Sequence, residues 1–212
     1  MVITWYGQAC FKIQSGPLSL IIDPFEQKIG LTPPKIEAQL VLVTHDHYDH
    51  NNIATVKGNP FVVDGPGEFE YQGVRILGVP SFHDNVEGKE RGLNTIYAMD
   101  IEGMRLVHLG DIGQDKLIDE QIEALGTVNI LLVPVGGVFT VNAEHAIEIV
   151  NQVGPQLVIP MHYKVKGLKV ELEDASAFLK EIGHPDAAPQ DKLTVKKKDL
   201  PEERTDVVVM KV

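Results

Sequence analysis

The chain has 212 residues, 43% of them hydrophobic and 23% charged, which is enough to bury a sizeable core in a soluble globular protein. Its formal net charge of −11 disfavours unaided binding to a nucleic-acid backbone, and its single cysteine, Cys10, excludes an intramolecular disulfide and a cysteine-based metal cluster. No apolar run approaches the roughly 18 residues of a membrane span, and the first residues lack the basic and apolar regions of a signal peptide, so we expect a cytoplasmic protein that contacts no membrane.

Short strands separated by turn residues open the chain. The predicted strands are 2–6, 10–14, 18–22 and 39–44. Asp23 places a carboxylate at the tip of the third strand, and the proline-containing segment 25–35 is expected to be a loop. The apolar run 40–43 is typical of a buried strand.

The middle of the chain combines a short helix with hairpins. Asn51 or Asn52 can cap a short helix that reaches about residue 57. The strands that we expect beyond it are 60–64, 68–71, 74–79, 94–100 and 104–109. The polar segment 81–92 lies between two of these strands and is long enough to be a functional loop.

The second half alternates between helices and strands. The expected helices are 114–125, 141–153 and 173–182, and the expected strands are 128–133, 156–159, 194–195 and 205–212. No linker, low-complexity segment or short repeat interrupts the pattern. We therefore predict one domain over residues 1–212, with two sheets and outer helices.

The segment 44–51 holds the densest group of potential metal ligands in the sequence. Three of the eight histidines and two carboxylates lie within residues 45–50. Buried imidazole and carboxylate groups are costly unless they are paired or bound to a metal. A solvated polar loop is the alternative, but the cluster follows an apolar strand, and the end of such a strand is a usual position for a site. We therefore predict that this segment binds metal.

The spacing divides these ligands between two metals. His45 and His47 are two residues apart and point the same way in an extended segment, so they can share one metal. Asp49 and His50 follow where the chain bends toward the predicted short helix, and they can face a second metal. Further ligands are needed, because each site of this kind fills about four or five positions.

Three further candidates follow predicted strands, and they are His83, Asp111 and His162. Each has an ordinary alternative, namely a loop histidine for His83 and His162 and a helix cap for Asp111. The predicted first group of ligands is His45, His47 and His83, and the predicted second group is Asp49, His50 and His162. Asp111 and a solvent hydroxide are expected to bridge the two metals. Nitrogen and oxygen donors of this kind suit two divalent ions, which we take to be Zn²⁺, with Mn²⁺ or Fe as alternatives.

The order His45-x-His47-x-Asp49-His50, followed by His83, Asp111 and His162, resembles the metallo-β-lactamase superfamily along nearly the whole chain. Segments such as Trp5-Tyr6-Gly7 and His108-Leu109-Gly110-Asp111 resemble its branch of metal-dependent hydrolases akin to ascorbate 6-phosphate lactonase. The resemblance implies an α+β fold, a four-layer αββα sandwich with a two-metal site at one edge of the sheets. That branch usually has Gly-His where this chain has Gly7-Gln8, so a histidine at the edge of the expected site is missing.

The predicted chemistry is hydrolysis. The bridging hydroxide attacks the electrophilic carbon or phosphorus of a small ester, lactone or phosphoester, and Asp49 is the catalytic residue that orients or deprotonates it. We expect Asp23 behind a ligand, where it orients an imidazole, with a plain turn carboxylate as the alternative. A phosphodiesterase acting on nucleotides or nucleic acid, an iron-dependent oxygenase and a silent binding scaffold stay open as other functions. Assembly into a homo-oligomer also stays open.

The sequence gives weaker evidence of a functional role for three other polar residues. Lys89 and Arg91, in the predicted loop 81–92, can bind an anionic group of a substrate, but a solvated charged loop explains them as well. His108 is interpreted as a core histidine with satisfied hydrogen bonds.

Overall fold

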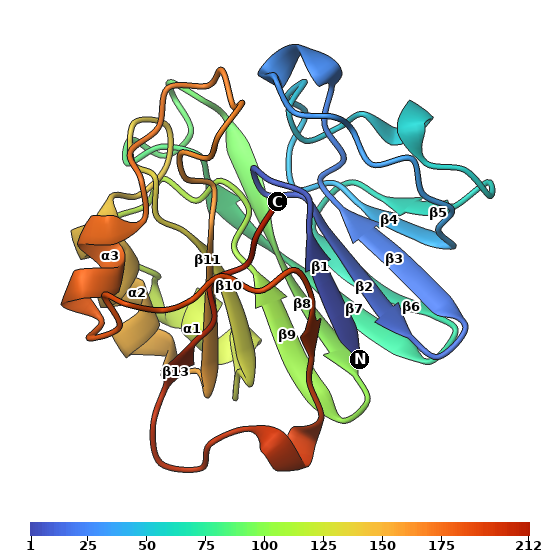
Figure 1. Cartoon of the computed structure of the whole chain (residues 1–212). Helices are drawn as coiled ribbons and strands as arrows, with labels where there is room; N and C mark the ends of the chain where they lie inside the picture. Colours follow the sequence, from blue (N-terminus) through green and yellow to red (C-terminus); the bar gives the residue numbers. More distant parts are fainter.

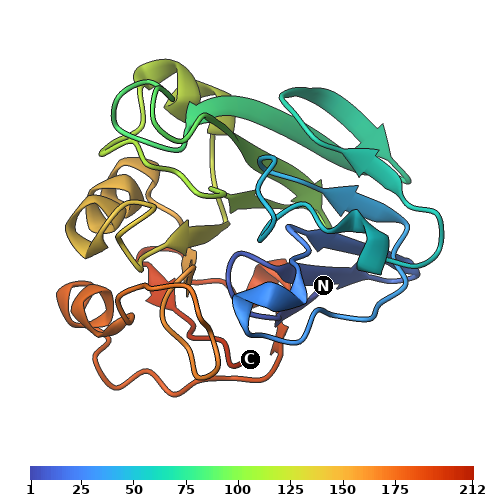
Figure 2. The same ribbon diagram turned by 90° about the horizontal axis from the view of Figure 1, so that it is seen from above.

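A computed structural model describes all 212 residues. Two β-sheets pack face to face, and α1 (Asp119–Leu125), α2 (Ala143–Val153) and α3 (Ser176–Glu181) lie on the outer side of one of them (Figures 1 and 2). The 3-10 helices η1 (Gln27–Ile29) and η2 (Ile53–Thr55), with their flanking loops, lie on the outer side of the other. The predicted α+β sandwich is therefore confirmed. No helix has the length and apolar character that crossing a membrane requires.

The first sheet has six strands in the order β12-β1-β2-β3-β4-β5. Its strands are β1 (Val2–Trp5), β2 (Phe11–Ser15), β3 (Leu18–Ile22), β4 (Leu40–Leu42), β5 (Phe61–Val63) and β12 (Leu193–Thr194). The neighbours β1, β2 and β3 are antiparallel, whereas β3, β4 and β5 are parallel. Because β3 and β4 are parallel, the residues that follow both of them lie at the same edge of the sheet.

The second sheet has seven strands in the order β13-β11-β10-β9-β8-β7-β6. Its strands are β6 (Gly67–Tyr71), β7 (Val74–Phe82), β8 (Leu93–Ile101), β9 (Met104–His108), β10 (Ile130–Pro134), β11 (Leu157–Met161) and β13 (Asp206–Val207). Strands β6 to β9 are antiparallel, and β9, β10, β11 and β13 are parallel. Strands β7, β9 and β11 therefore run in one direction and end at one edge.

Alternating side chains of the central strands enter two separate cores. In β3 and β4, Leu20, Ile22 and Leu42 belong to the main core of 47 buried residues between and around the sheets. Ile21 and Val41 point the other way and belong to a second cluster of 11 buried residues under the loops of the first sheet. Burial on both faces explains why these short strands read as continuous apolar runs.

Hydrogen bonds between the sheets fix the edge at which the strands end. The backbone N–H of Thr95 in β8 donates to the carbonyl of Thr44 at 2.9 Å. The hydroxyl of Tyr97, also in β8, donates to the carbonyl of Val43 at 2.9 Å. The end of β4 is thereby held against the opposite sheet, so the strand ends of both sheets meet along one edge.

All four predicted helices are shorter than expected: those predicted over 141–153 and 173–182 are Ala143–Val153 and Ser176–Glu181, and the other two differ more in kind. The helix predicted over 114–125 begins only at Asp119, because Leu117 is buried in the main core and its backbone N–H donates to the side chain of Gln152 at 2.9 Å. The helix predicted after Asn51 or Asn52 is the single 3-10 turn η2, and the Asn52 amide donates to the carbonyl of Phe25 at 2.9 Å instead of capping it. A polar side chain can satisfy a loop carbonyl as readily as a helix end, so cap residues alone overpredict helix.

Candidate metal site

Four strand ends supply the side chains of the site. The segment 44–50 follows β4, His83 follows β7, and His162 follows β11, while Asp111 lies three residues beyond β9. All seven residues predicted as ligands come together there. Three overlapping groups with ligand atoms within 4.8 Å of one another are His45, His47 and His83; His45, His50 and Asp111; and Asp49, His50 and His162.

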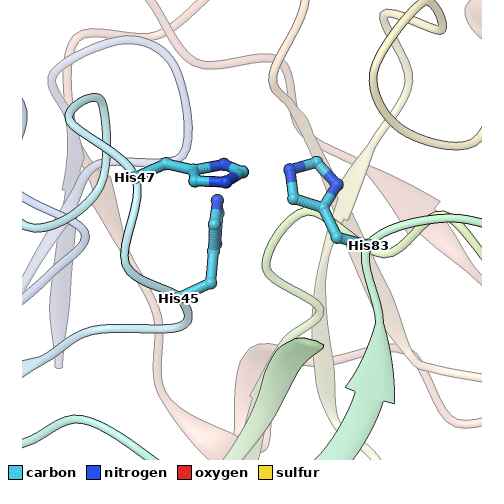
Figure 3. A group of neighbouring side chains, drawn as sticks. All are labelled: His45, His47 and His83. Atoms are coloured by element: carbon cyan, nitrogen blue, oxygen red, sulfur yellow. The ribbon is translucent and has the colours of Figure 1, made fainter. Parts of the chain in front are cut away.

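The first predicted group of histidines surrounds one small space, as Figure 3 shows. The ring centroid of His45 is 4.6 Å from that of His47 and 4.7 Å from that of His83, and those of His47 and His83 are 5.1 Å apart. The predicted reason for the closeness of His45 and His47 is wrong. The backbone N–H of His47 donates to the carbonyl of His45 at 3.1 Å, so the segment is tightly turned and not extended.

The Asp111 carboxylate lies between the two predicted groups of ligands. Its Oδ2 is 3.5 Å from Nε2 of His83 in the first group. In the second group it is 3.2 Å from Nε2 of His50 and 3.0 Å from Nε2 of His162. One buried carboxylate oxygen is therefore within reach of imidazoles from three different strand ends. The helix-cap alternative does not apply, because the nearest α-helix begins eight residues later, at Asp119.

Asp23 supports the site from behind. Its side chain is fully buried, and its Oδ2 is 2.9 Å from Nδ1 of His50. The same carboxylate accepts hydrogen bonds from the backbone N–H of Thr44 at 2.8 Å and from its hydroxyl at 2.7 Å. An acceptor at Nδ1 keeps the proton on that nitrogen and leaves Nε2 free to face Asp111.

Gln8 is a site residue to which the sequence assigned no role. It is fully buried, and its Nε2 donates to Oδ2 of Asp49 at 2.8 Å and lies 2.8 Å from Nε2 of His162. Both Gln8 and His162 have positive φ, of 53° and 51°, and the backbone N–H of His162 donates to the carbonyl of Gln8 at 3.0 Å. Non-glycine residues in this conformation are uncommon and concentrate at functional sites. The sequence signal for it was the resemblance, which places a histidine at the edge of the site at this position.

The site mixes opposite shifts of pKa within a few ångströms. Burial, and then the charge of His50, hold the pKa of His45 well below its usual range. Burial also acts to lower the pKa of His50, yet the carboxylates of Asp111 and Asp23 raise it well above the usual range. Burial acts to raise the pKa of Asp111, yet the charges of His162 and His50 hold it well below its usual range. The cluster thus favours anionic carboxylates with a cation between them.

The buried polar atoms of the site fit a bound metal. Five atoms of the candidate ligands have no hydrogen-bond partner: Nε2 of His45, Nε2 of His50, Nδ1 of His83, Oδ1 of Asp111 and Nδ1 of His162. Buried polar atoms are nearly always paired, so this concentration in one place is unusual. In addition, Nε2 of His162 can donate to Asp111 or accept from Gln8 but cannot do both, and a cation among them removes this conflict. The nitrogen and oxygen donors suit Zn²⁺, Mn²⁺ or Fe.

A cleft of about 470 Å³ opens over these ligands. His47, Asp49, His83, Asp111 and His162 form its floor. The other lining residues come from η1 and from loops, and they are Lys28, Ile29, Tyr48, Arg91, Phe139, Lys169, Val170 and Glu171. The volume suits a small molecule, and its floor is the group of candidate ligands.

His108 lies close to the site but is satisfied within the core, as interpreted from the sequence. It is fully buried, with Nε2 2.9 Å from the carbonyl of Ala9, and Nδ1 accepts from the backbone N–H of Gly110 at 3.0 Å. Both ring nitrogens are thus used, which leaves none for a metal.

Comparisons with known proteins agree with this geometry. The family model of the β-lactamase superfamily domain matches residues 2–162. A metal-dependent hydrolase of Thermococcus onnurineus is 30% identical over 188 residues, and the match covers 76% of this chain and 84% of the relative. A metal-dependent hydrolase of Methanoculleus marisnigri is 33% identical over 187 residues, and the match covers 77% of this chain and 81% of the relative. The crystal structure of a candidate Zn-dependent hydrolase of the metallo-β-lactamase superfamily from Thermotoga maritima superimposes with a TM-score of 0.81 at 36% identity, covering 99% of this chain and 97% of its own.

Proposed function

The chain belongs to the metallo-β-lactamase superfamily, and from that premise we propose that it is a metal-dependent hydrolase with a dinuclear centre that acts on a small ester, lactone or phosphoester. His45, His47 and His83 would hold one metal ion, and Asp49, His50 and His162 the other. Asp111 would contact both ions. When bound, two such ions supply a nucleophilic water of lowered pKa and polarise the oxygen of the substrate.

The protein side chains orient the reactants around this centre. Asp49 is half-buried on the floor of the cleft, and the Gln8 amide donates to its Oδ2 at 2.8 Å. We assign Asp49 as the residue that orients the attacking water and takes its proton, while the water oxygen forms the new bond to carbon or phosphorus. The leaving group departs with the electron pair of the broken bond and takes a proton from solvent.

The position of Asp111 is the single observation that carries the proposal. One carboxylate oxygen lies 3.0 to 3.5 Å from three imidazoles that belong to both groups of ligands. A carboxylate that serves only one metal, or only a turn, does not need this position. The arrangement supports two adjacent cations that share one ligand.

The test uses Asp111→Ala with Asp115→Ala as the matched control, since Asp115 is an exposed carboxylate that approaches only His145, at 3.3 Å. Lactones, thioesters, phosphodiesters and phosphomonoesters are screened with the wild-type protein first. Asp111→Ala should lose metal and turnover, and Asp115→Ala should keep both. An Asp111→Ala protein that holds two metals per chain and full activity contradicts the proposal.

The same screen decides between substrate classes. The resemblance to the branch of ascorbate 6-phosphate lactonase favours a lactone or a phosphate-bearing small molecule, and turnover of phosphodiesters alone favours the phosphodiesterase alternative. If the protein consumes O₂ and requires Fe, the result favours an oxygenase reaction over hydrolysis. We expect Zn²⁺ to be the native metal, with Mn²⁺ or Fe as the alternatives that metal analysis resolves.

A further inference from the structure

We propose that the cleft over the candidate metal site binds small organic anions, and that Arg91 binds a carboxylate or phosphate group of the substrate remote from the bond that is hydrolysed. This inference rests on the proposed function, because it concerns the substrate of the same site. It adds a class of substrate and a residue that selects it.

The rim of the cleft is cationic although the chain as a whole carries a net charge of −11. Beyond the candidate ligands, the charged side chains that line it are Lys28, Arg91, Lys169 and Glu171. Three cations and one carboxylate therefore line the cleft, and Lys28 also pairs with Glu26, outside the lining, at 2.9 Å. Clustered charge of one sign in a cleft concentrates ligands of the opposite sign there, so this rim attracts anions.

Arg91 lies on a loop whose backbone is tied to one buried carboxylate. Its backbone N–H donates to Oδ2 of Asp84 at 2.8 Å, and Asp84 also accepts backbone N–H groups from Val86, Gly88 and Glu90. Asp84 is buried, so one carboxylate organises the whole loop that carries Arg91. A guanidinium on an ordered loop loses less conformational freedom when it binds an anion.

The guanidinium of Arg91 lies over an aromatic ring, and its positive charge has only a distant carboxylate partner. Its central carbon lies 5.6 Å from the ring centroid of Phe139, an arrangement in which the ring stacks with the cation. Its only carboxylate contact is Glu90 at 3.8 Å, close to the limit for an ion pair. The charge therefore remains available to a ligand in the cleft.

The structure separates Arg91 from Lys89, which the sequence could not do. The Lys89 side chain is 73% exposed and pairs with Glu87 at 3.3 Å, and it does not line the cleft. The Arg91 side chain is 36% exposed and lines the cleft with His83 and Asp111. Lys89 is therefore the solvated loop residue and serves as the control for Arg91.

Apolar side chains beside Arg91 indicate the rest of the ligand. Phe139 is 38% exposed and Tyr48 is 43% exposed, so both rings present apolar surface to solvent. With Phe139 and Tyr48 lining the cleft, the favoured ligand is an anion on a short carbon frame.

The experiment measures binding and needs no turnover. Metal-loaded protein is titrated calorimetrically with dicarboxylates of three to six carbons, each matched to the monocarboxylate of the same length. One carboxylate can occupy the metals, and the second can reach Arg91 at the right length. We expect at least one dicarboxylate to bind about tenfold more tightly than its partner, as one charge-assisted contact implies.

The variants decide whether Arg91 is responsible. Arg91→Ala should abolish the tenfold difference, Arg91→Lys should keep part of it, and Lys89→Ala should keep all of it. A wild-type protein that binds every matched pair equally, or an Arg91→Ala protein that keeps the full difference, overturns the inference. Metal content measured on the same samples tests the proposed function separately, because a protein that does not load two metals contradicts the proposed function, whereas a loaded protein without the Arg91-dependent difference contradicts only this inference.

Discussion

Replacing Asp23 by Asn tests how the second group of ligands is oriented. The two oxygens of Asp23 accept three hydrogen bonds, from the N–H and hydroxyl of Thr44 and from Nδ1 of His50. Asn offers one oxygen and one NH₂. If the oxygen faces His50, the NH₂ meets the N–H of Thr44, and if the NH₂ faces His50, the imidazole proton must move to Nε2. In the second arrangement Nε2 can no longer bind a metal.

The magnitude follows from these contacts. Partners that orient a metal-binding histidine are each worth about 10- to 100-fold in metal affinity, and we expect a loss in this range for Asp23→Asn. That loss corresponds to about 1.4 to 2.8 kcal/mol. The metal-free chain should also lose about 2 to 3 kcal/mol of its free energy of unfolding, because one charge-assisted hydrogen bond is lost within a fully buried group.

The assay is competition for Zn²⁺ against a chelator of known affinity, with urea unfolding of the metal-free protein beside it. Asp46→Asn is the control, because Asp46 is an exposed carboxylate in the same segment and the substitution removes the same charge. The control should keep the affinity of the wild type within about twofold, as expected for a solvated side chain. Wild-type metal affinity in Asp23→Asn refutes the reasoning.

Two further predictions concern residues around the same site. Asp84→Asn should lower the free energy of unfolding by about 3 kcal/mol at neutral pH, since Asn can accept only two of the four backbone N–H groups. Burial acts to raise the pKa of Asp84, but these N–H groups hold it at about 2 against an ordinary 3.8. The stabilisation by Asp84 is therefore present above pH 3.8 and is lost as the pH falls through 2. Equal destabilisation by Asp84→Asn at pH 7 and pH 2 in urea unfolding would speak against this prediction. Gln8→Leu should lower metal affinity about tenfold, because the hydrogen bond to Asp49 is lost. It should change the free energy of unfolding of the metal-free chain by less than about 1 kcal/mol, because an unpaired buried oxygen is removed as well. Unchanged metal retention after dialysis against a chelator would show that Gln8 does not position Asp49.

The sequence located the candidate ligands because each stands at the end of an apolar strand. His45, His83, Asp111 and His162 could all be found this way, since parallel strands place their ends at a common edge. The seven residues do come together, while their role as ligands stays a prediction. The single domain over residues 1–212 also stays a prediction, and one cooperative unfolding transition is its test.

Other parts of the site depended on long-range contacts that no local pattern contains. Gln8 approaches His162 across 154 positions of sequence, through two residues of positive φ. Arg91 and Lys89 differ in exposure within a loop that is held by backbone hydrogen bonds from Glu90 and Arg91 to Asp84. The predicted start of the first α-helix failed for the same reason, because Leu117 is tied to Gln152 on another helix.

The most direct test of the dinuclear centre is a titration of the metal-free protein with Zn²⁺, with hydrolysis of the best substrate from the screen followed at each point. We predict that two ions bind per chain and that full hydrolysis requires the second equivalent. Full activity with one equivalent, or activity that no metal changes, would contradict the account.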